Sequence, residues 1–200
     1  MPVTLYLGAP ACGKTTLMRS HVAALIEAHP DLVFLIVNHG ERPDRPTWRD
    51  LPCDYQVYRT VADWWRAPSR VAIFEGEDPV AVAQLAIDAG WSVYADDECD
   101  GILQESWKTS PLREIVKRGR HLPNRANDVT EVYALLATHR PVNLPTDISG
   151  LFDSVYVGRL YAYNDAERVR REGWINGRNV EDAQATLNAL TPGQFHLWQG

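Results

Sequence analysis

The chain has 200 residues, a formal net charge of −6 at pH 7 and a hydrophobic share of 45%. This length suits a single domain, 1–200, and the composition is that of a globular protein, neither disordered nor fibrous. The negative charge argues against a uniformly basic nucleic-acid-binding coat, although it allows a local basic stripe or a pore lined by loops of several subunits.

The three cysteines, Cys12, Cys53 and Cys99, are widely separated and form no C-x-x-C pair. This spacing argues against a zinc site or a disulfide framework and favours a reducing compartment. No segment approaches the roughly 20 apolar residues of a membrane span, and the chain opens on a strand pattern instead of a signal peptide. We therefore expect no membrane span and a cytoplasmic location.

The first motif lies near the N-terminus. Residues 3–7 form a short apolar run that predicts a buried strand, and residues 8–15 then match G-x-x-x-x-G-K-[ST] at every fixed position. Residues 16–26 place apolar side chains at helical spacing, which completes the strand–loop–helix context of a phosphate-binding loop. The candidate nucleotide-binding residues are Gly8, Ala9, Pro10, Ala11, Cys12, Gly13, Lys14, Thr15 and Thr16.

The residue types of this loop suit a nucleoside triphosphate. Gly8 and Gly13 allow a tight turn whose backbone amides point at phosphate oxygens, and the positive end of the following helix adds to the attraction. We expect Lys14 to reach the β- and γ-phosphates and the Thr15 hydroxyl to ligate Mg²⁺. We interpret Cys12 as a small residue in the turn. The expected cofactors are ATP and Mg²⁺.

Further along the chain, strand and helix patterns alternate. Strands are predicted at 31–37, 55–58, 70–75, 91–95, 132–137, 153–160 and 193–198. Helices are predicted after Thr60, at 79–89, at 111–121 with a stop at Gly119, at 164–172 and at 180–190. We interpret 38–52 and 122–128 as loops, and we expect the Trp64–Trp65 pair to pack in the core or at a subunit interface. This order predicts an α/β phosphate-loop NTPase fold, with a central, mostly parallel sheet flanked by helices on both faces.

An acidic triplet, Asp96-Asp97-Glu98, directly follows the strand at 91–95. In phosphate-loop enzymes an acidic residue at the end of a central strand holds Mg²⁺, and a following glutamate can activate the attacking water. We predict Asp97 as the metal ligand and Glu98 as the general base. Asp96 is the alternative metal ligand, one residue earlier in the register.

Two later segments add candidates. The helix at 111–121 carries Arg118 and Arg120 at its end, where they either stabilise the helix C-terminus or reach the γ-phosphate of a neighbouring subunit. The strand at 132–137 leads into Thr138-His139-Arg140-Pro141. His139 is therefore either structural or placed to sense the γ-phosphate.

The order of these four pieces resembles the FtsK–HerA superfamily of DNA-translocating ATPases, which have a RecA/FtsK-like fold. In that family an Arg-rich segment follows the acidic motif and a strand then ends in Thr-Gln-Arg-Pro. This chain departs from the pattern in having His139 where glutamine is usual. A bare ATPase core of this size is most similar to the genome-packaging ATPases of tailless icosahedral viruses with internal membranes.

The resemblance implies a ring, with a hexamer favoured, that hydrolyses ATP at its subunit interfaces and moves double-stranded DNA without reading its sequence. The residues implied to be catalytic are Lys14, Glu98, Arg118, Arg120 and His139. The insertion after Arg120 makes Arg125 a third candidate for the arginine that acts on the neighbouring site. Capsid vertex proteins are implied as further partners, and the host cytoplasm or the virion as the location. The competing hypotheses are a nucleoside or nucleotide kinase and a non-catalytic nucleotide-dependent switch.

Overall fold

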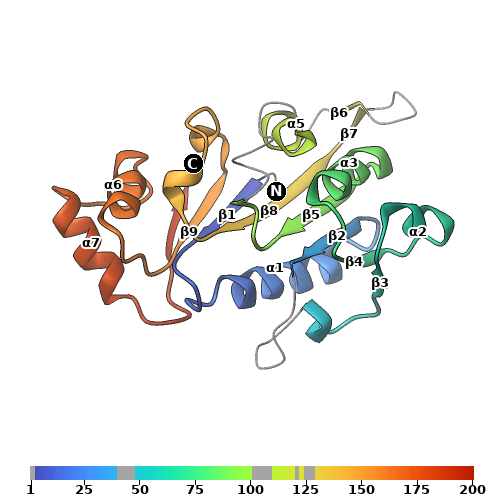
Figure 1. The fold of residues 1–200 in the computed structure, drawn as a ribbon, viewed down its shortest axis with the longest axis horizontal. Coiled ribbons are helices and arrows are strands. Elements are labelled where there is room, and N and C mark those ends of the chain that lie inside the picture. Colours follow the sequence, from blue (N-terminus) through green and yellow to red (C-terminus); the bar gives the residue numbers. More distant parts are fainter. Residues whose placement is uncertain (1–2, 40–47, 101–109, 120–121, 124–128) are drawn as a thin grey trace.

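The computed structural model describes residues 3–39, 48–100, 110–119, 122–123 and 129–200. One eight-stranded sheet dominates it, in the strand order β10-β9-β1-β8-β5-β2-β4-β3 (Figure 1). Its strands are β1 (Val3–Leu7), β2 (Val33–Asn38), β3 (Gln56–Tyr58), β4 (Val71–Glu75), β5 (Ser92–Asp96), β8 (Val132–Thr138), β9 (Ser154–Val157) and β10 (His196–Gln199). Only the β9–β10 pair of this sheet is antiparallel.

Helices cover both faces of the sheet (Figure 1). They are α1 (Lys14–Ala28), α2 (Val61–Arg66), α3 (Pro79–Ala89), α5 (Pro111–Arg118), α6 (Tyr163–Arg171) and α7 (Val180–Ala189). Short 3₁₀ turns lie at Trp48–Asp50, Pro141–Asn143 and Ser149–Leu151. The predicted fold class is therefore confirmed. None of the described helices is long and apolar enough to cross a membrane.

The sheet separates two apolar clusters, because successive side chains of a strand point to opposite faces. On β5, Val93 and Ala95 belong to the cluster that contains Met18 of α1, whereas Tyr94 belongs to the cluster that contains Leu85 of α3. The continuous apolar runs of the sequence thus become strands that are buried on both faces, as in other parallel sheets. Because β1, β8, β5 and β2 run parallel, the polar residues that follow their carboxyl ends lie together at one side of the sheet.

Three predicted segments differ from the structure. The strand predicted at 153–160 is shortened to β9, which ends at Val157 because its partner β1 ends at Leu7. The Gly158 amide makes the last bond of this pair, to the Leu7 carbonyl at 2.8 Å. The closing strand begins later than predicted, at His196, after a turn in which the Gln194 amide donates to the Thr191 carbonyl at 3.0 Å. Part of the predicted loop at 122–128 is a strand, since β6 (Leu122–Pro123) pairs with β7 (Val129–Thr130).

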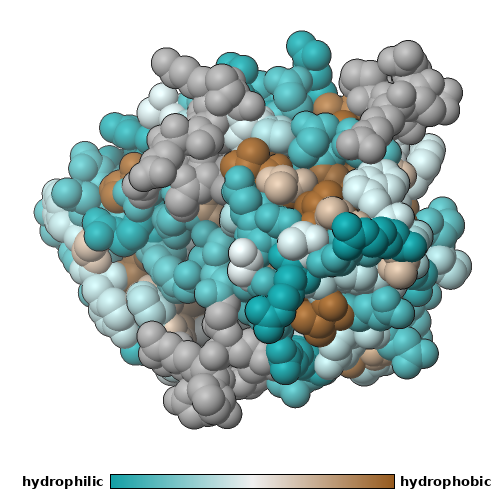
Figure 2. All heavy atoms as spheres, turned by 45° about the vertical axis from the view of Figure 1, so that its right-hand side comes forward, coloured by the Kyte–Doolittle hydropathy of each residue, from teal (hydrophilic) through white to brown (hydrophobic). Residues whose placement is uncertain are grey.

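The tryptophan pair of α2 divides between core and surface. Trp64 is 5% exposed and packs in the core as predicted. Trp65 is 41% exposed and so lies outside the core, and its packing at a subunit interface stays a prediction. The face drawn in Figure 2 is mainly hydrophilic, with hydrophobic residues in small separate patches. Patches of this kind are normal on globular proteins and identify no binding surface by themselves.

Candidate active site

The loop between β1 and α1 has the backbone that the sequence pattern predicts. Gly13 adopts φ +100°, a left-handed conformation that favours glycine. A Cβ on Gly8 would lie 2.5 Å from Cys12 Sγ, so only glycine fits there without a shift of that side chain. Pro10 and Ala11 are exposed and Cys12 is buried, which agrees with Cys12 as a small residue packed inside the turn.

The loop is braced from the C-terminal part of the chain. The Ala9 amide donates to the Arg159 carbonyl at 2.7 Å, and the Gly193 amide donates to the Cys12 carbonyl at 2.9 Å. The Ala9 amide thus bonds to the segment after β9 and is not free for a phosphate. The amides at the start of α1 have no partner within the helix and remain the natural donors for an anion.

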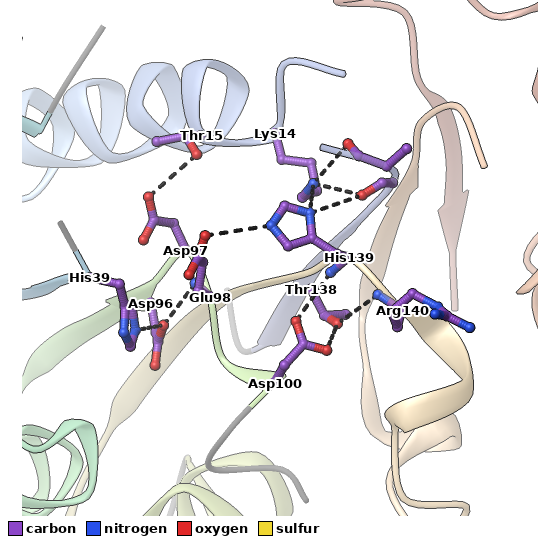
Figure 3. Close-up of polar contacts among 12 residues, drawn as sticks. Lys14, Thr15, His39, Asp96, Asp97, Glu98, Asp100, Thr138, His139 and Arg140 are labelled. Atoms are coloured by element: carbon purple, nitrogen blue, oxygen red, sulfur yellow. Dashed lines mark hydrogen bonds and ion pairs between the residues drawn. The ribbon is translucent and has the colours of Figure 1, made fainter. Parts of the chain in front are cut away.

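Lys14 lies at the centre of the site, with only 4% of the residue exposed. Its ammonium donates to the carbonyls of Gly8 at 2.6 Å and Ala9 at 3.1 Å, and it lies 2.8 Å from His139 Nδ1 (Figure 3). Burial lowers the pKa of Lys14, while Cys12 and nearby carboxylates act in the opposite direction. All three ammonium hydrogens thus point at acceptors that bound phosphate oxygens would replace.

Thr15 and Asp97 bring two oxygen ligands together. The Thr15 hydroxyl donates to Asp97 Oδ2 at 3.3 Å, and the indole of the buried Trp48 donates to the same oxygen at 3.2 Å. Adjacent ligands of an octahedral Mg²⁺ lie about 2.9 Å apart, so this hard-oxygen pair fits that ion after a small adjustment. Burial, with the charge of Asp96 as the next cause, raises the pKa of Asp97 to about 6.

Asp96 has a different environment from Asp97. It is completely buried, and its Oδ1 lies 2.8 Å from His39 Nε2 and accepts the Glu98 amide at 3.0 Å. Its Oδ2 accepts the Tyr94 hydroxyl at 2.9 Å. His39, Asp96 and Asp97 each place one potential ligand atom within 4.8 Å of the others. Of the two aspartates, however, Asp97 is the one that contacts Thr15.

Glu98 lies at the open side of the site, where 56% of its side chain is exposed. Its Oε1 is 3.5 Å from His139 Nε2, and the other ring nitrogen of His139 faces Lys14 (Figure 3). Because an ammonium can only donate, we assign Nδ1 as the acceptor and place the ring proton on Nε2, directed at Glu98. One imidazole thereby connects the lysine of the loop with the acidic turn.

Sequence reasoning missed Asp100. Its carboxylate accepts hydrogen bonds from the Thr138 hydroxyl at 2.5 Å, the His139 amide at 3.2 Å and the Asn143 side chain at 3.4 Å. It therefore holds the end of β8, and with it His139, against the acidic turn. The next residue, Arg140, forms an ion pair with the buried Asp165 of α6 at 3.0 Å, which extends the polar network to the C-terminal helices.

The candidate arginines do not join this site within the described part of the chain. Arg118 is exposed at the end of α5 and pairs with Glu114 at 3.6 Å. The adjacent Gly119 accepts a hydrogen bond from Val132 at the start of β8, whereas His139 follows the end of β8. A strand of seven residues spans roughly 20 Å, so Arg118 lies at the opposite edge of the sheet from its own phosphate loop. Arg120 and Arg125 lie outside the described residues.

The remaining loop candidate, Thr16, is exposed on the first turn of α1. The site thus brings together Lys14, Thr15, Asp97, Glu98 and His139 from two strand ends, those of β5 and β8, and the start of α1. This convergence at the carboxyl ends of parallel strands is where open α/β sheets bind their ligands.

No protein-family model matches the sequence, and no curated protein matches it. Solved structures match its fold. The DNA-packaging ATPase B204 of Sulfolobus turreted icosahedral virus gives a TM-score of 0.68 at 15% identity, covering 99% of this chain and 92% of that one. The chain has the fold of a phosphate-loop NTPase.

Two nucleotide complexes of the genome-packaging NTPase B204 from Sulfolobus turreted icosahedral virus 2 show the same likeness. With AMPPCP the TM-score is 0.70 at 14% identity, covering 99% of this chain and 92% of that one. With ATPγS it is 0.67 at 14% identity, covering 99% and 91%. At such identities the likeness establishes the fold, and the activity has to be argued from the residues of the site.

Proposed function

We propose that the protein is an ATPase of the FtsK–HerA type that uses Mg²⁺ and ATP to translocate double-stranded DNA. It acts as the genome-packaging motor of a virus. The observation that carries the proposal is the Lys14–His139–Glu98 chain of contacts at 2.8 and 3.5 Å. In these contacts His139, the proposed sensor, joins Lys14, the proposed phosphate-binding cation, to Glu98, the proposed general base. The nearly full-length likeness to B204 proteins, which are described as genome-packaging NTPases, supports the biological role.

The residues divide the chemistry among themselves. Lys14 exchanges its carbonyl and imidazole acceptors for β- and γ-phosphate oxygens, and Glu98 takes the proton of the attacking water. Thr15 and Asp97 hold Mg²⁺, which neutralises charge on the phosphates when it is bound. Hydrolysis then removes the γ-phosphate and returns Lys14 to His139. His139 reports this change to Thr138 and Arg140, and through Asp165 to α6.

In the proposed assembly the subunits form a ring, with a hexamer favoured, around double-stranded DNA. Loops of several subunits contact the DNA backbone, so that a subunit with a net charge of −6 needs no basic coat of its own. The ring operates in the host cytoplasm or on the virion, next to capsid vertex proteins.

The steady-state ATPase rate tests this function. We expect double-stranded DNA to stimulate hydrolysis regardless of its sequence, because the contacts are to phosphates. Between about 50 and 200 mM salt, the DNA concentration for half-maximal stimulation should rise at least about tenfold, since released counterions oppose binding. Two unrelated duplexes of equal length provide the control. An unchanged rate with DNA, together with phosphorylation of an added nucleoside, would instead establish the kinase.

Mixed rings test the position of the arginine. Because Arg118 lies away from its own site, we expect Arg118→Ala or Arg120→Ala to impair hydrolysis by removing a charge from the neighbouring site. Mixing the impaired variant equally with Lys14→Ala subunits should restore activity at roughly a quarter of the interfaces, because each such interface joins an intact loop to an intact arginine. Arg113→Ala, on the same helix, is the matched control. Absence of recovery would show that neither arginine acts across the interface.

A further inference from the structure

Asp96 carries a carboxylate in a position that is completely buried. It ends β5, no part of it is exposed, and removing a carboxylate from water is strongly unfavourable unless donors surround it. Three donors do so, from the His39 ring, the Tyr94 hydroxyl and the Glu98 amide. Such a fully bonded buried carboxylate fixes the geometry of the groups that it contacts.

We propose that Asp96 is a positioning residue, whose buried carboxylate fixes the backbone at Glu98 and is itself held by His39 and Tyr94. The catalytic consequence rests on the proposed role of Glu98 as general base. The assignment also separates the two neighbouring aspartates. Asp97 contacts Thr15 on the α1 side of the sheet, while Asp96 lies with Tyr94 on the α3 side.

The contact between Asp96 and Glu98 is a local turn. Asp96 Oδ1 accepts the amide two residues later at 3.0 Å, the arrangement of an Asx-turn. The side chain of Glu98 is 56% exposed, and its contact with His139 is 3.5 Å long. Little else among the described contacts restrains the Glu98 carboxylate, so the direction of its backbone decides where the carboxylate lies.

His39 and Tyr94 hold the carboxylate from two strands. In the parallel pair of β2 and β5, Val37 is opposite Asp96, so His39 follows β2 at the level of the acidic turn. Its Nε2 lies 2.8 Å from the same oxygen that accepts the Glu98 amide (Figure 3). Tyr94, two residues before Asp96 on the same face of β5, donates to the other oxygen at 2.9 Å. The acidic turn is thereby tied to the centre of the sheet.

Substitutions of Asp96 test the assignment. We expect Asp96→Ala to lower kcat about 100-fold, because a misplacement near 1 Å has this effect, while the Kd for ATP and the half-saturating Mg²⁺ concentration change less than about threefold. Asp96→Asn should recover most of kcat, since asparagine forms the same Asx-turn. His39→Gln and Tyr94→Phe should lower kcat about three- to tenfold. Asp88→Ala, on α3, is the matched control.

Amide hydrogen exchange provides a readout that needs no catalysis. In Asp96→Ala the Glu98 amide should exchange at least about tenfold faster than in the parent, because its acceptor is gone, and it should be unchanged in Asp88→Ala. If Asp96→Ala does not fold, exchange of the Glu98 amide is measured in Asp96→Asn and His39→Gln instead, and each is compared with Tyr94→Phe. There Asp96→Asn should keep the amide protected and His39→Gln should speed its exchange modestly.

Three results would overturn the inference. An unchanged exchange rate of the Glu98 amide in Asp96→Ala would show that Asp96 does not hold this amide. A loss of the response to Mg²⁺ in Asp96→Asn, as expected for Asp97→Asn, would make Asp96 a metal ligand instead. A normal kcat in Asp96→Ala leaves only a structural role. Absence of ATPase activity in the parent chain would instead refute the proposed function, while the exchange measurement would still decide whether Asp96 positions Glu98.

Discussion

Glu98→Gln is expected to keep ATP binding and to lower turnover by about 10²–10⁴-fold, the usual contribution of a general base. Glutamine keeps the size of the side chain and its position beside His139, but it cannot accept a proton from water at neutral pH. Because the Glu98 side chain is largely exposed and 3.5 Å from its nearest described ion-pair partner, the change should leave the fold intact. The bound nucleotide should therefore persist unhydrolysed.

Lys14→Ala is expected to fail one step earlier, at binding. The Lys14 ammonium is buried, and in the proposed function its contacts to two carbonyls and His139 give way to phosphate oxygens. Charge-assisted hydrogen bonds contribute about 1.5–3 kcal/mol each, so the loss of two should weaken ATP binding by at least about 100-fold. Equilibrium binding of ATP and single-turnover hydrolysis separate the two variants, with Lys117→Ala on α5 as the control. If Lys14→Ala and Glu98→Gln lose ATP binding equally, Glu98 is not the general base.

The sequence predicted the parts of the site that depend on neighbouring residues. Gly13, Lys14 and Thr15 form one contiguous motif, and the apolar runs before and after it already indicate a strand and a helix. The same holds for the position of Asp97 directly after a buried strand. In these cases local pattern and global fold agree, so the pattern suffices.

Contacts between distant segments could not be predicted in this way. Asp100 meets Thr138 only because β5 and β8 are adjacent in the sheet, and His39 meets Asp96 only because β2 lies on the other side of β5. Strand order of this kind depends on the packing of the whole chain, and a one-residue change of register would turn each side chain to the other face. The choice between Asp96 and Asp97 stayed open at the sequence level for this reason.

The short elements were hard to predict for a different reason. The antiparallel pair of β6 and β7 joins two residues with two, which is too short to give an alternating pattern. The end of β9 follows from the end of its partner β1 at Leu7, and Gly158 then lies where an added Cβ would meet the Phe195 ring. Each of these features is decided by tertiary contacts that override local propensity.

Asp97→Asn is expected to abolish the response to Mg²⁺ and to lower Mg²⁺-dependent hydrolysis at least about 100-fold, because the amide carries no charge for the ion. In the parent, burial raises the pKa of Asp97 to about 6, so this carboxyl binds a proton more readily in the folded state than in the unfolded one. By linkage, its contribution to the free energy of unfolding decreases as pH rises from about 4 to about 6. Mg²⁺ should offset that loss at neutral pH, where the carboxylate is ionised.

The pH dependence makes this prediction specific to Asp97. Protons and Mg²⁺ compete for one carboxylate, so the half-saturating Mg²⁺ concentration should rise about tenfold per pH unit below about pH 6 and level off above it. Thermal unfolding with and without Mg²⁺ at pH 5 and pH 7 measures this without catalysis, because a ligand bound to the native state raises Tm. Asp147→Asn, at the exposed ion pair with Lys117, should keep the parent's Mg²⁺ response at both pH values. An Mg²⁺ requirement that is the same at pH 5 and pH 7 would mean that the ion is held by other groups than the buried carboxylate beside Thr15.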